Sequence, residues 1–106
     1  MQQIKDITPK QLMEGITGHY VHGENSSFGL LEIEAGTVMS LHQHVHEQIT
    51  YILEGELDMD IGGVVHSLIP GSYHVIHSNV LHGAYAKTAC KLIVVFSPVS
   101  DEFKTF

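Results

Sequence analysis

Two histidines separated by a single residue, His42 and His44, are the part of this sequence best suited to chemistry. Residues two apart in a β-strand point to the same face, so the two imidazoles can lie side by side, with Cα atoms about 6.5–7 Å apart. This spacing suits two ligands of one metal ion, and histidine is the commonest metal ligand. The chain holds nine histidines in 106 residues, which is a further reason to expect a metal site.

His46 and Gln48 share the strand parity of His42 and His44. A straight strand cannot aim all four side chains at one atom, because they would span roughly 20 Å. A corner near residues 45–47 would let Gln48 return to the ion from the next strand, and it would leave His46 at the rim or in solvent. Four other histidines match no ligand pattern; they are His19, His22, His66 and His74.

The elements that must position these residues read as short strands divided by glycine and polar turns. Strands are expected at 31–34, 38–42, 48–53, 56–61, 64–69, 73–76, 81–87 and 91–96. The pair Gly62-Gly63 predicts a two-residue hairpin turn. About eight short strands favour a closed barrel or double-sheet jelly roll, which can just enclose one small ligand or metal. An immunoglobulin-like sandwich is the alternative, but it does not explain where the histidines fall.

One short helix is predicted near the amino terminus. Thr8 offers a capping hydroxyl, Pro9 suits the first helical position, and Gln11 follows the cap by three residues. Gly15 would end this helix after a turn or two.

Composition limits the class of protein and its partners. We expect one domain over residues 1–106, because two cores would not fit, and 43% apolar with 16% charged residues suits a packed core. A net charge of -7, with no arginine, disfavours nucleic acid and anionic membranes and removes the usual carboxylate clamp. The apolar runs are too short to span a membrane. Residues 1–6 show no secretory signal, and the single Cys90 cannot form an internal disulfide, so a cytoplasmic protein is expected.

The histidine segment resembles the first motif of the cupin superfamily. The matching positions are Gly36, His42, His44, Gln48 and Gly55, with Gln48 where the family usually has glutamate. A second motif over 71–86 departs from the family at His77, Asn79 and Ala86 but keeps its ligand histidine at His82. The resemblance covers about residues 28–97. It implies an all-β fold, a single-domain cupin with the double-stranded β-helix or jelly-roll barrel.

The resemblance also implies a site. Its metal ligands would be His42, His44, Gln48 and His82, around one divalent ion that could be Zn, Ni, Fe, Mn or Cu. Further candidates for the pocket are His46, His77, Phe28, Met39, Met59, Tyr51, Tyr85 and Phe96. Because glutamine is a neutral ligand, the ion keeps its full +2 charge, which favours Lewis-acid chemistry over redox chemistry.

Longer segments are similar to the KdgF-like pectin-degradation cupins, notably His42–Gln48, Leu53–Glu56 and Val95–Phe103. That similarity implies a small-molecule ligand and linearisation of unsaturated uronates. Two positions depart from the group, since Val94 and Ser100 replace its aspartate and arginine. A metal-dependent dioxygenase and a non-enzymatic binding cupin are the alternatives. A homodimer is expected from the small core and from the resemblance.

Overall fold

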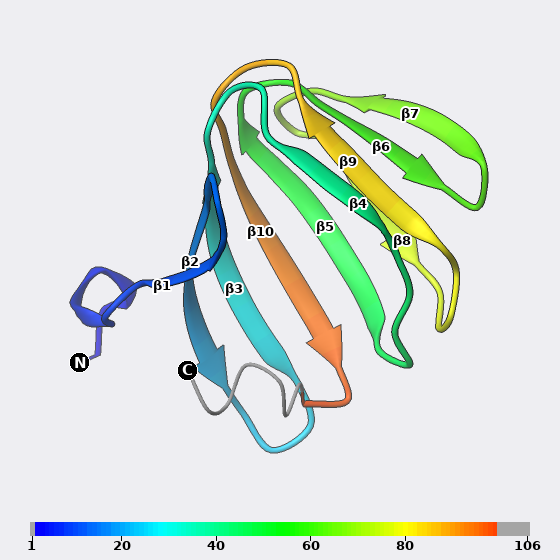
Figure 1. Cartoon of the computed structure of the whole chain (residues 1–106). Coiled ribbons are helices and arrows are strands. Elements are labelled where there is room, and N and C mark those ends of the chain that lie inside the picture. Colours follow the sequence, from blue (N-terminus) through cyan, green and yellow to red (C-terminus); the bar gives the residue numbers. More distant parts are fainter. Residues whose placement is uncertain (1, 100–106) are drawn as a thin grey trace.

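The computed structural model describes residues 2–99, which form two antiparallel β-sheets that face each other (Figure 1). The larger sheet has the strand order β1-β2-β3-β10-β5-β8, and the smaller sheet has the order β4-β9-β6-β7. The strands are β1 (Lys10–Met13), β2 (Ile16–His22), β3 (Ser27–Ile33), β4 (Val38–His42), β5 (Glu47–Glu54), β6 (Leu57–Ile61), β7 (Val64–Leu68), β8 (Tyr73–Ile76), β9 (His82–Ala86) and β10 (Cys90–Ser97). This arrangement confirms the predicted all-β fold.

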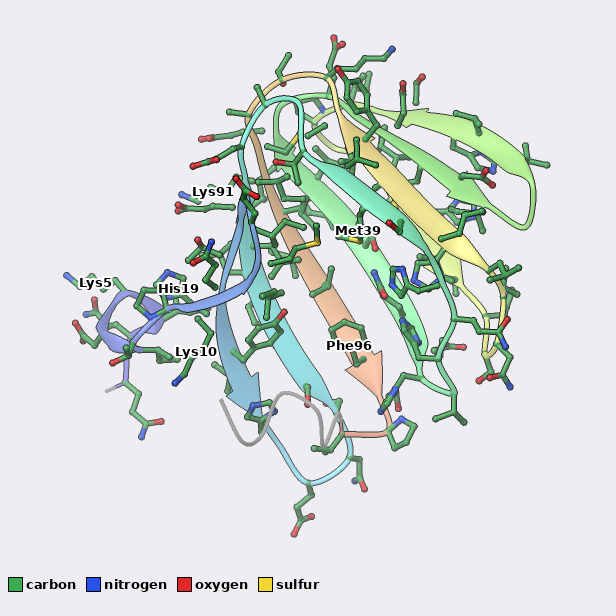
Figure 2. All side chains as sticks on the ribbon, viewed as in Figure 1. Lys5, Lys10, His19, Met39, Lys91 and Phe96 are labelled. Carbon is green, nitrogen blue, oxygen red and sulfur yellow. The ribbon has the colours of Figure 1, made fainter. Side chains whose placement is uncertain are left out.

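The core lies between the two sheets because alternate side chains of each strand point inward. Along β10, Leu92, Val94 and Phe96 are buried, while the residues between them are partly exposed. Ile52 of β5 and Ile76 of β8 are fully buried. Burial of such a side chain contributes about 1.5–3 kcal/mol. In Figure 2, the labelled Met39 and Phe96 lie between the two sheets, and the labelled Lys5, Lys10 and Lys91 lie at the periphery.

The hairpin predicted at Gly62-Gly63 is confirmed. Strands β6 and β7 pair antiparallel, and Ile61 lies opposite Val64 across the turn. Both glycines have positive φ, +59° and +90°, which a tight turn of this kind requires and which other residues rarely adopt.

The helix predicted between Thr8 and Gly15 is wrong, because residues 10–13 form strand β1. Lys10 pairs with Gly18, and Met13 pairs with Ile16 of β2. Gly15, with φ +88°, belongs to the turn between these strands. The capping signal is local, and four residues of helix would gain less than edge pairing with β2. In the described chain the one helical segment is a 3-10 turn, Ile4–Asp6, and no helix is long and apolar enough to cross a membrane.

The outer face of the larger sheet carries an uncharged, mainly apolar band, which we call the outer band. Two rows of cross-strand neighbours form it: Val21, Phe28, Val95, Ile49 and Val75 in one row, and His19, Leu30, Ile93, Tyr51 and Tyr73 in the other. All ten are partly or largely exposed, and Tyr73 keeps 70% of its surface. Next to the band lies a charged row that contains Glu32 and Lys91.

Candidate metal centre

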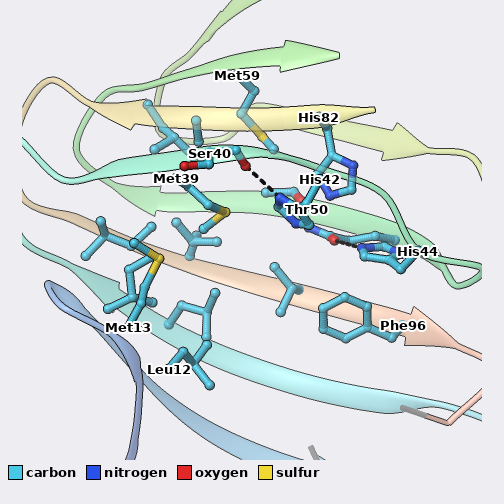
Figure 3. Close-up of a pocket in the computed structure, with 18 of the residues that line it drawn as sticks. Leu12, Met13, Met39, Ser40, His42, His44, Thr50, Met59, His82 and Phe96 are labelled. Carbon is cyan, nitrogen blue, oxygen red and sulfur yellow. Dashed lines mark hydrogen bonds between the residues drawn. The ribbon is translucent and has the colours of Figure 1, made fainter. Parts of the chain in front are cut away.

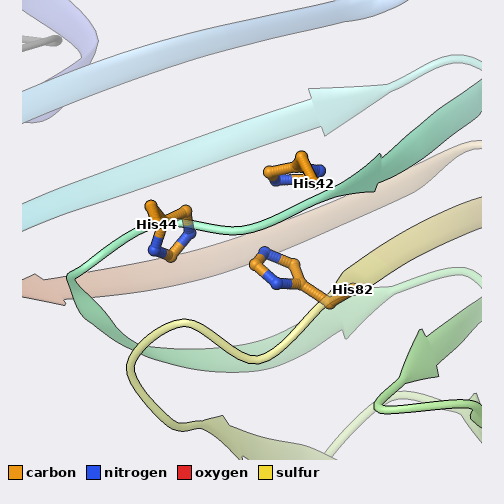
Figure 4. Close-up of side chains that lie close together, drawn as sticks. All are labelled: His42, His44 and His82. Atoms are coloured by element: carbon orange, nitrogen blue, oxygen red, sulfur yellow. The ribbon is translucent and has the colours of Figure 1, made fainter.

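Three histidines from three chain segments converge between the sheets (Figure 4). His42 ends β4, His44 follows in the loop, and His82 begins β9. Register pairs His42 directly with His82, and their ring centroids are 4.3 Å apart. The ring of His44 lies 4.9 Å from that of His82. One ligand nitrogen from each of the three residues lies within 4.8 Å of the other two, so the cluster could hold a metal ion.

A bulge in β4 aims His42 into this cluster. Met39 pairs with Ala84 and His42 pairs with His82, so β4 has one more residue here than β9. In a regular strand, Met39 and His42 are three residues apart and would point to opposite faces, yet both line the same cavity because the bulge absorbs one residue. Gly83 makes the bulge possible, since a Cβ there would lie 2.7 Å from the Met39 carbonyl oxygen.

Backbone carbonyl groups orient all three imidazoles. Each ring places Nδ1 within hydrogen-bond distance of the carbonyl oxygen two residues away along the chain, and a carbonyl can only accept. The pairs are His42 Nδ1 with Ser40 at 2.8 Å, His44 Nδ1 with His46 at 2.9 Å and His82 Nδ1 with Val80 at 2.9 Å. Donation from Nδ1 leaves the lone pair on Nε2 of each neutral ring, which is the form that binds metals.

The buried ring of His82 fits a cation. His82 is 1% exposed, and its Nε2 has no hydrogen-bond partner among the described residues. Burial, and then the neighbouring rings of His42 and His44, lower the pKa of His82, despite its hydrogen bond to Val80. A neutral imidazole with an unsatisfied acceptor nitrogen is costly in a dry interior. A metal ion shared with the other two rings would satisfy it.

Gln48 adds an amide to the cluster from the start of β5. It is 8% exposed, and its Oε1 lies 3.2 Å from His44 Nε2. Its amide nitrogen donates to Thr50 Oγ1 at 3.0 Å, which turns Oε1 toward the histidines. The chain therefore turns between His44 and Gln48 as the sequence required, and the role of Gln48 as a ligand is still a prediction.

The cluster lies at one end of a cavity of about 400 Å³ between the sheets (Figure 3). Twelve of the nineteen residues that line it are apolar, and none of these nineteen is Asp, Glu or Lys. Tyr20 contributes an aromatic wall because Gly18 and Gly29 leave room for its ring; a Cβ at either would lie under 3 Å from it. Burial raises the pKa of Tyr20, so its phenol stays protonated.

Seven of the predicted site residues line this cavity. They are His42, His44, Gln48, His82, Met39, Met59 and Phe96. His46 lies beside it, with its ring centroid 5.7 Å from that of His44 and 6.2 Å from that of Phe96. Val94, 1% exposed, is also in the wall, and Ser100 lies outside the described residues.

Four predicted pocket residues are not among those that line the cavity. Phe28, Tyr51 and Tyr85 have the opposite parity to their inward-facing neighbours, so they point to the outer faces of the sheets. His77 is exposed between β8 and β9.

Several residues of the cavity were missed from sequence. Leu12 and Met13 enter it because β1 is a strand, and Tyr20, Ser40 and Thr50 also line it. Gly83, directly after His82, is a sequence signal only for the close approach of β4 at residues 39–41, which brings Ser40 to the wall.

A second pair of histidines lies apart from the cluster. His66 of β7 and His74 of β8 have ring centroids 4.6 Å apart, and they belong to the edge strands of different sheets. Burial lowers the pKa of His74, and repulsion from His66 and His77 lowers it further.

Comparison with known proteins agrees with the fold. The profile of the cupin domain family matches residues 29–96. An L-ectoine synthase from Nocardia farcinica (strain IFM 10152) is 30% identical over 79 residues, which cover 72% of this chain and 60% of that enzyme. The match therefore spans less than two thirds of the curated relative.

Two solved structures are similar over nearly their whole lengths. KdgF from Halomonas sp. is 27% identical with a TM-score of 0.86, over 92% of both chains. An RmlC-like cupin from Shewanella frigidimarina NCIMB 400 has a TM-score of 0.91 and 24% identity, over 96% of this chain and 93% of that one. The second likeness concerns the fold alone.

Proposed function

Since this chain belongs to the cupin domain family, we propose that it binds one divalent transition-metal ion and uses it in non-redox chemistry on a small acid. The observation that carries this proposal is the convergence of three imidazoles on one point, each with Nδ1 beside a backbone carbonyl and Nε2 left to bind. Three such nitrogens are a common protein donor set for zinc, nickel, iron, manganese or copper.

His42, His44 and His82 would hold the ion, and Gln48 Oε1 would be the fourth protein ligand. When bound there, the ion would act as a Lewis acid that polarises an oxygen atom of the substrate. All four ligands are neutral, so no anionic protein group stabilises a higher oxidation state, and this favours non-redox chemistry. The carbonyl groups of Ser40, His46 and Val80 would fix the orientation of the rings.

The substrate class in this proposal is a small sugar acid or keto acid. Similarity to KdgF from Halomonas sp. supports a uronate reaction of the kind expected for KdgF-like cupins. Among the residues that line the described cavity, the phenol of Tyr20 is a side chain that holds a proton at neutral pH. Because burial raises its pKa, this phenol would donate a hydrogen bond to a substrate oxygen rather than release its proton.

One observation favours a second candidate, a non-enzymatic binding protein for small molecules. The part of the cavity wall formed by described residues offers no carboxylate or amine to serve as a general base. Binding of a metal and an acid without any turnover would then be the whole function.

Metal content tests the proposal first. The full-length chain, purified without a tag, is expected to bind one Zn²⁺ or Co²⁺ per chain by calorimetry and elemental analysis. The His82→Ala variant should lose at least 100-fold in affinity, because it removes a buried donor. His66→Ala is the matched control, since this histidine lies outside the cluster, and it should leave the affinity of the cluster unchanged. Equal metal binding by His82→Ala and wild type would refute the proposed site.

Turnover separates the two candidates. Metal-loaded wild type is expected to convert an unsaturated uronate or a keto acid, followed by proton NMR, while His42→Ala should not. Equal conversion by both would reject a metal-dependent reaction. Tight binding without product during long incubation would favour the binding protein. Oxygen uptake by the Fe²⁺ form would instead indicate a dioxygenase.

A further inference from the structure

The cavity beside the histidines differs sharply in polarity along its length (Figure 3). The imidazoles of His42, His44 and His82 occupy one end, and Leu12 and Met13 of β1 lie toward the other. Apolar groups also come close to the cluster, since the ring centroid of Phe96 lies 5.8 Å from that of His44. A ligand that reaches the metal must therefore place the rest of its body against hydrocarbon.

Charge balance indicates what the ligand brings to the metal. The four predicted ligands are neutral, and the described residues that line the cavity include no carboxylate. A divalent ion in such a site lacks compensation by a protein group, and charge without a partner is unfavourable on the side of the site where His82 is buried. One anionic oxygen group of the ligand, bound to the ion, would cancel half of this charge. A second anionic group would meet no lysine, since none lines the described cavity, and the sequence has no arginine.

Hydroxyl groups on the ligand would find few partners. Thr50 Oγ1 already accepts a hydrogen bond from the Gln48 amide, and Thr50 is 1% exposed. The remaining hydroxyl-bearing side chains in the described wall are Ser40 and Tyr20. A sugar acid carries several hydroxyls, and those buried against leucine and methionine would lose their hydrogen bonds to water without replacement.

We propose that the ligand of this site is a carboxylic or 2-keto acid with a single negative charge and a branched or aromatic apolar body, rather than a polyhydroxylated sugar acid. This inference rests on the proposed function, because the bound metal supplies the positive charge. The cavity volume of about 400 Å³ falls within the range of small-molecule sites. Met39 and Met59 line it with flexible thioether side chains, which adapt to irregular apolar shapes.

The test uses the Co²⁺-loaded full-length chain and four probes: 4-methyl-2-oxopentanoate, phenylpyruvate, pyruvate and D-galacturonate. Calorimetry gives each dissociation constant, and visible absorption of Co²⁺ reports coordination of the metal. The first two probes are expected to bind at least tenfold more tightly than pyruvate, which has the same head group without the body. The affinities of these two probes should also exceed the affinity of D-galacturonate at least tenfold. The inference would be overturned if D-galacturonate or pyruvate bound as tightly as 4-methyl-2-oxopentanoate or phenylpyruvate. It would also be overturned if none of the four probes bound.

A variant of the wall links the preference to the cavity. Met39→Gln keeps the length of the side chain and adds an amide. It should weaken the binding of 4-methyl-2-oxopentanoate about tenfold and change the affinity for pyruvate less than twofold. Val64→Gln, at an exposed site of β7, is the control and should change neither. If circular dichroism shows that Met39→Gln does not fold, Met39→Ala replaces it. Equal loss for both probes in the folded variant would contradict the inference.

The two proposals fail in different ways. If no visible absorption of protein-bound Co²⁺ is seen, the proposed metal site is rejected, and the ligand inference, which depends on it, is rejected too. If Co²⁺ binds with one ion per chain but D-galacturonate is the preferred probe, the metal site stands and only the ligand inference is rejected.

Discussion

The Nε2 atom of His44 and the Oε1 atom of Gln48 lie 3.2 Å apart, and each presents a lone pair to the other. The Nδ1 atom of His44 faces the His46 carbonyl, and the Gln48 amide nitrogen faces Thr50. Both hydrogen donors are thus directed away from the contact. Two acceptors this close repel one another unless a cation or a proton lies between them.

We expect Gln48→Glu to strengthen metal binding and to destabilise the metal-free protein. The carboxylate would add an anionic ligand and should raise affinity for Zn²⁺ at least tenfold. Without the metal, the buried charge would face the acceptor nitrogen of His44, so the melting temperature of the metal-free form should fall. Calorimetry with Zn²⁺ and thermal unfolding in the presence of a chelator measure the two effects.

The matched control for that charge is Gln43→Glu. Gln43 is exposed in the segment between His42 and His44, and the same substitution there adds a solvated charge. It should change both quantities much less. Identical effects of the two substitutions would show that charge alone, and not ligation by residue 48, alters the affinity.

Gly83→Ala is expected to lower both the stability and the metal affinity. The new Cβ would lie 2.7 Å from the Met39 carbonyl oxygen and 3.2 Å from the Leu41 nitrogen. Overpacking of this kind costs about 1–3 kcal/mol, measured by denaturant unfolding. Displacement of the bulge would also move His42 from His82, so we expect at least tenfold weaker Zn²⁺ binding. Gly23→Ala is the control because its nearest contact is 3.4 Å, and a wild-type affinity in folded Gly83→Ala would contradict the role of the bulge.

The pair His66 and His74 predicts a loss of stability in mild acid. The pKa of His74 is lowered in the folded state, chiefly by burial and then by His66 and His77. The unfolded chain therefore binds a proton more readily, and its histidine titrates near pH 6.5. Stability contributed by neutral His74 is present above that pH and is lost as the pH falls toward the lower folded pKa.

Urea unfolding of the metal-free protein between pH 7.5 and 5.0 checks this prediction. His74→Gln should show a smaller fall in unfolding free energy than wild type over that range. His66→Gln should also reduce the fall, since it removes one of the two repelling rings. The same pH dependence in all three proteins would disprove the involvement of this pair.

The outer band predicts that two copies of the chain pair through the larger sheet. Each copy carries a net charge of -7, so association through an uncharged face avoids most of the mutual repulsion. An isologous pair needs one patch that complements itself, and the band offers apolar rows on five adjacent strands. Light scattering at micromolar concentration is expected to give twice the chain mass.

Ile49→Glu would place a charge near the middle of that band and should yield single chains. Val64→Glu, on exposed β7 of the other sheet, is the matched control and should stay paired. A wild type that scatters as one chain would refute pairing, and an Ile49→Glu variant that remains paired would exclude this face.

The sequence alone determined strands β4 to β10, the end of β3, the Gly62-Gly63 turn and the spacing of the histidines, whereas strand β2 was not predicted. These features follow local rules, because strand parity and the positive φ of glycine depend on a few neighbouring residues. The same parity could have removed Tyr51 from the pocket, since it lies three residues from Gln48 and so on the opposite face. Strand parity predicted the pairing of His42 with His44, whereas His82 followed from the resemblance to the second cupin motif.

Tertiary structure decided what local rules leave open. Residues 10–13 carry a capping signal for a helix, but their pairing with β2 makes them a strand and brings Leu12 and Met13 into the cavity. The bulge opposite Gly83 lets Met39 and His42 share one face, which no periodic pattern predicts. Both outcomes depend on partners distant in the chain, and the energy of such pairing is absent from any short stretch of sequence.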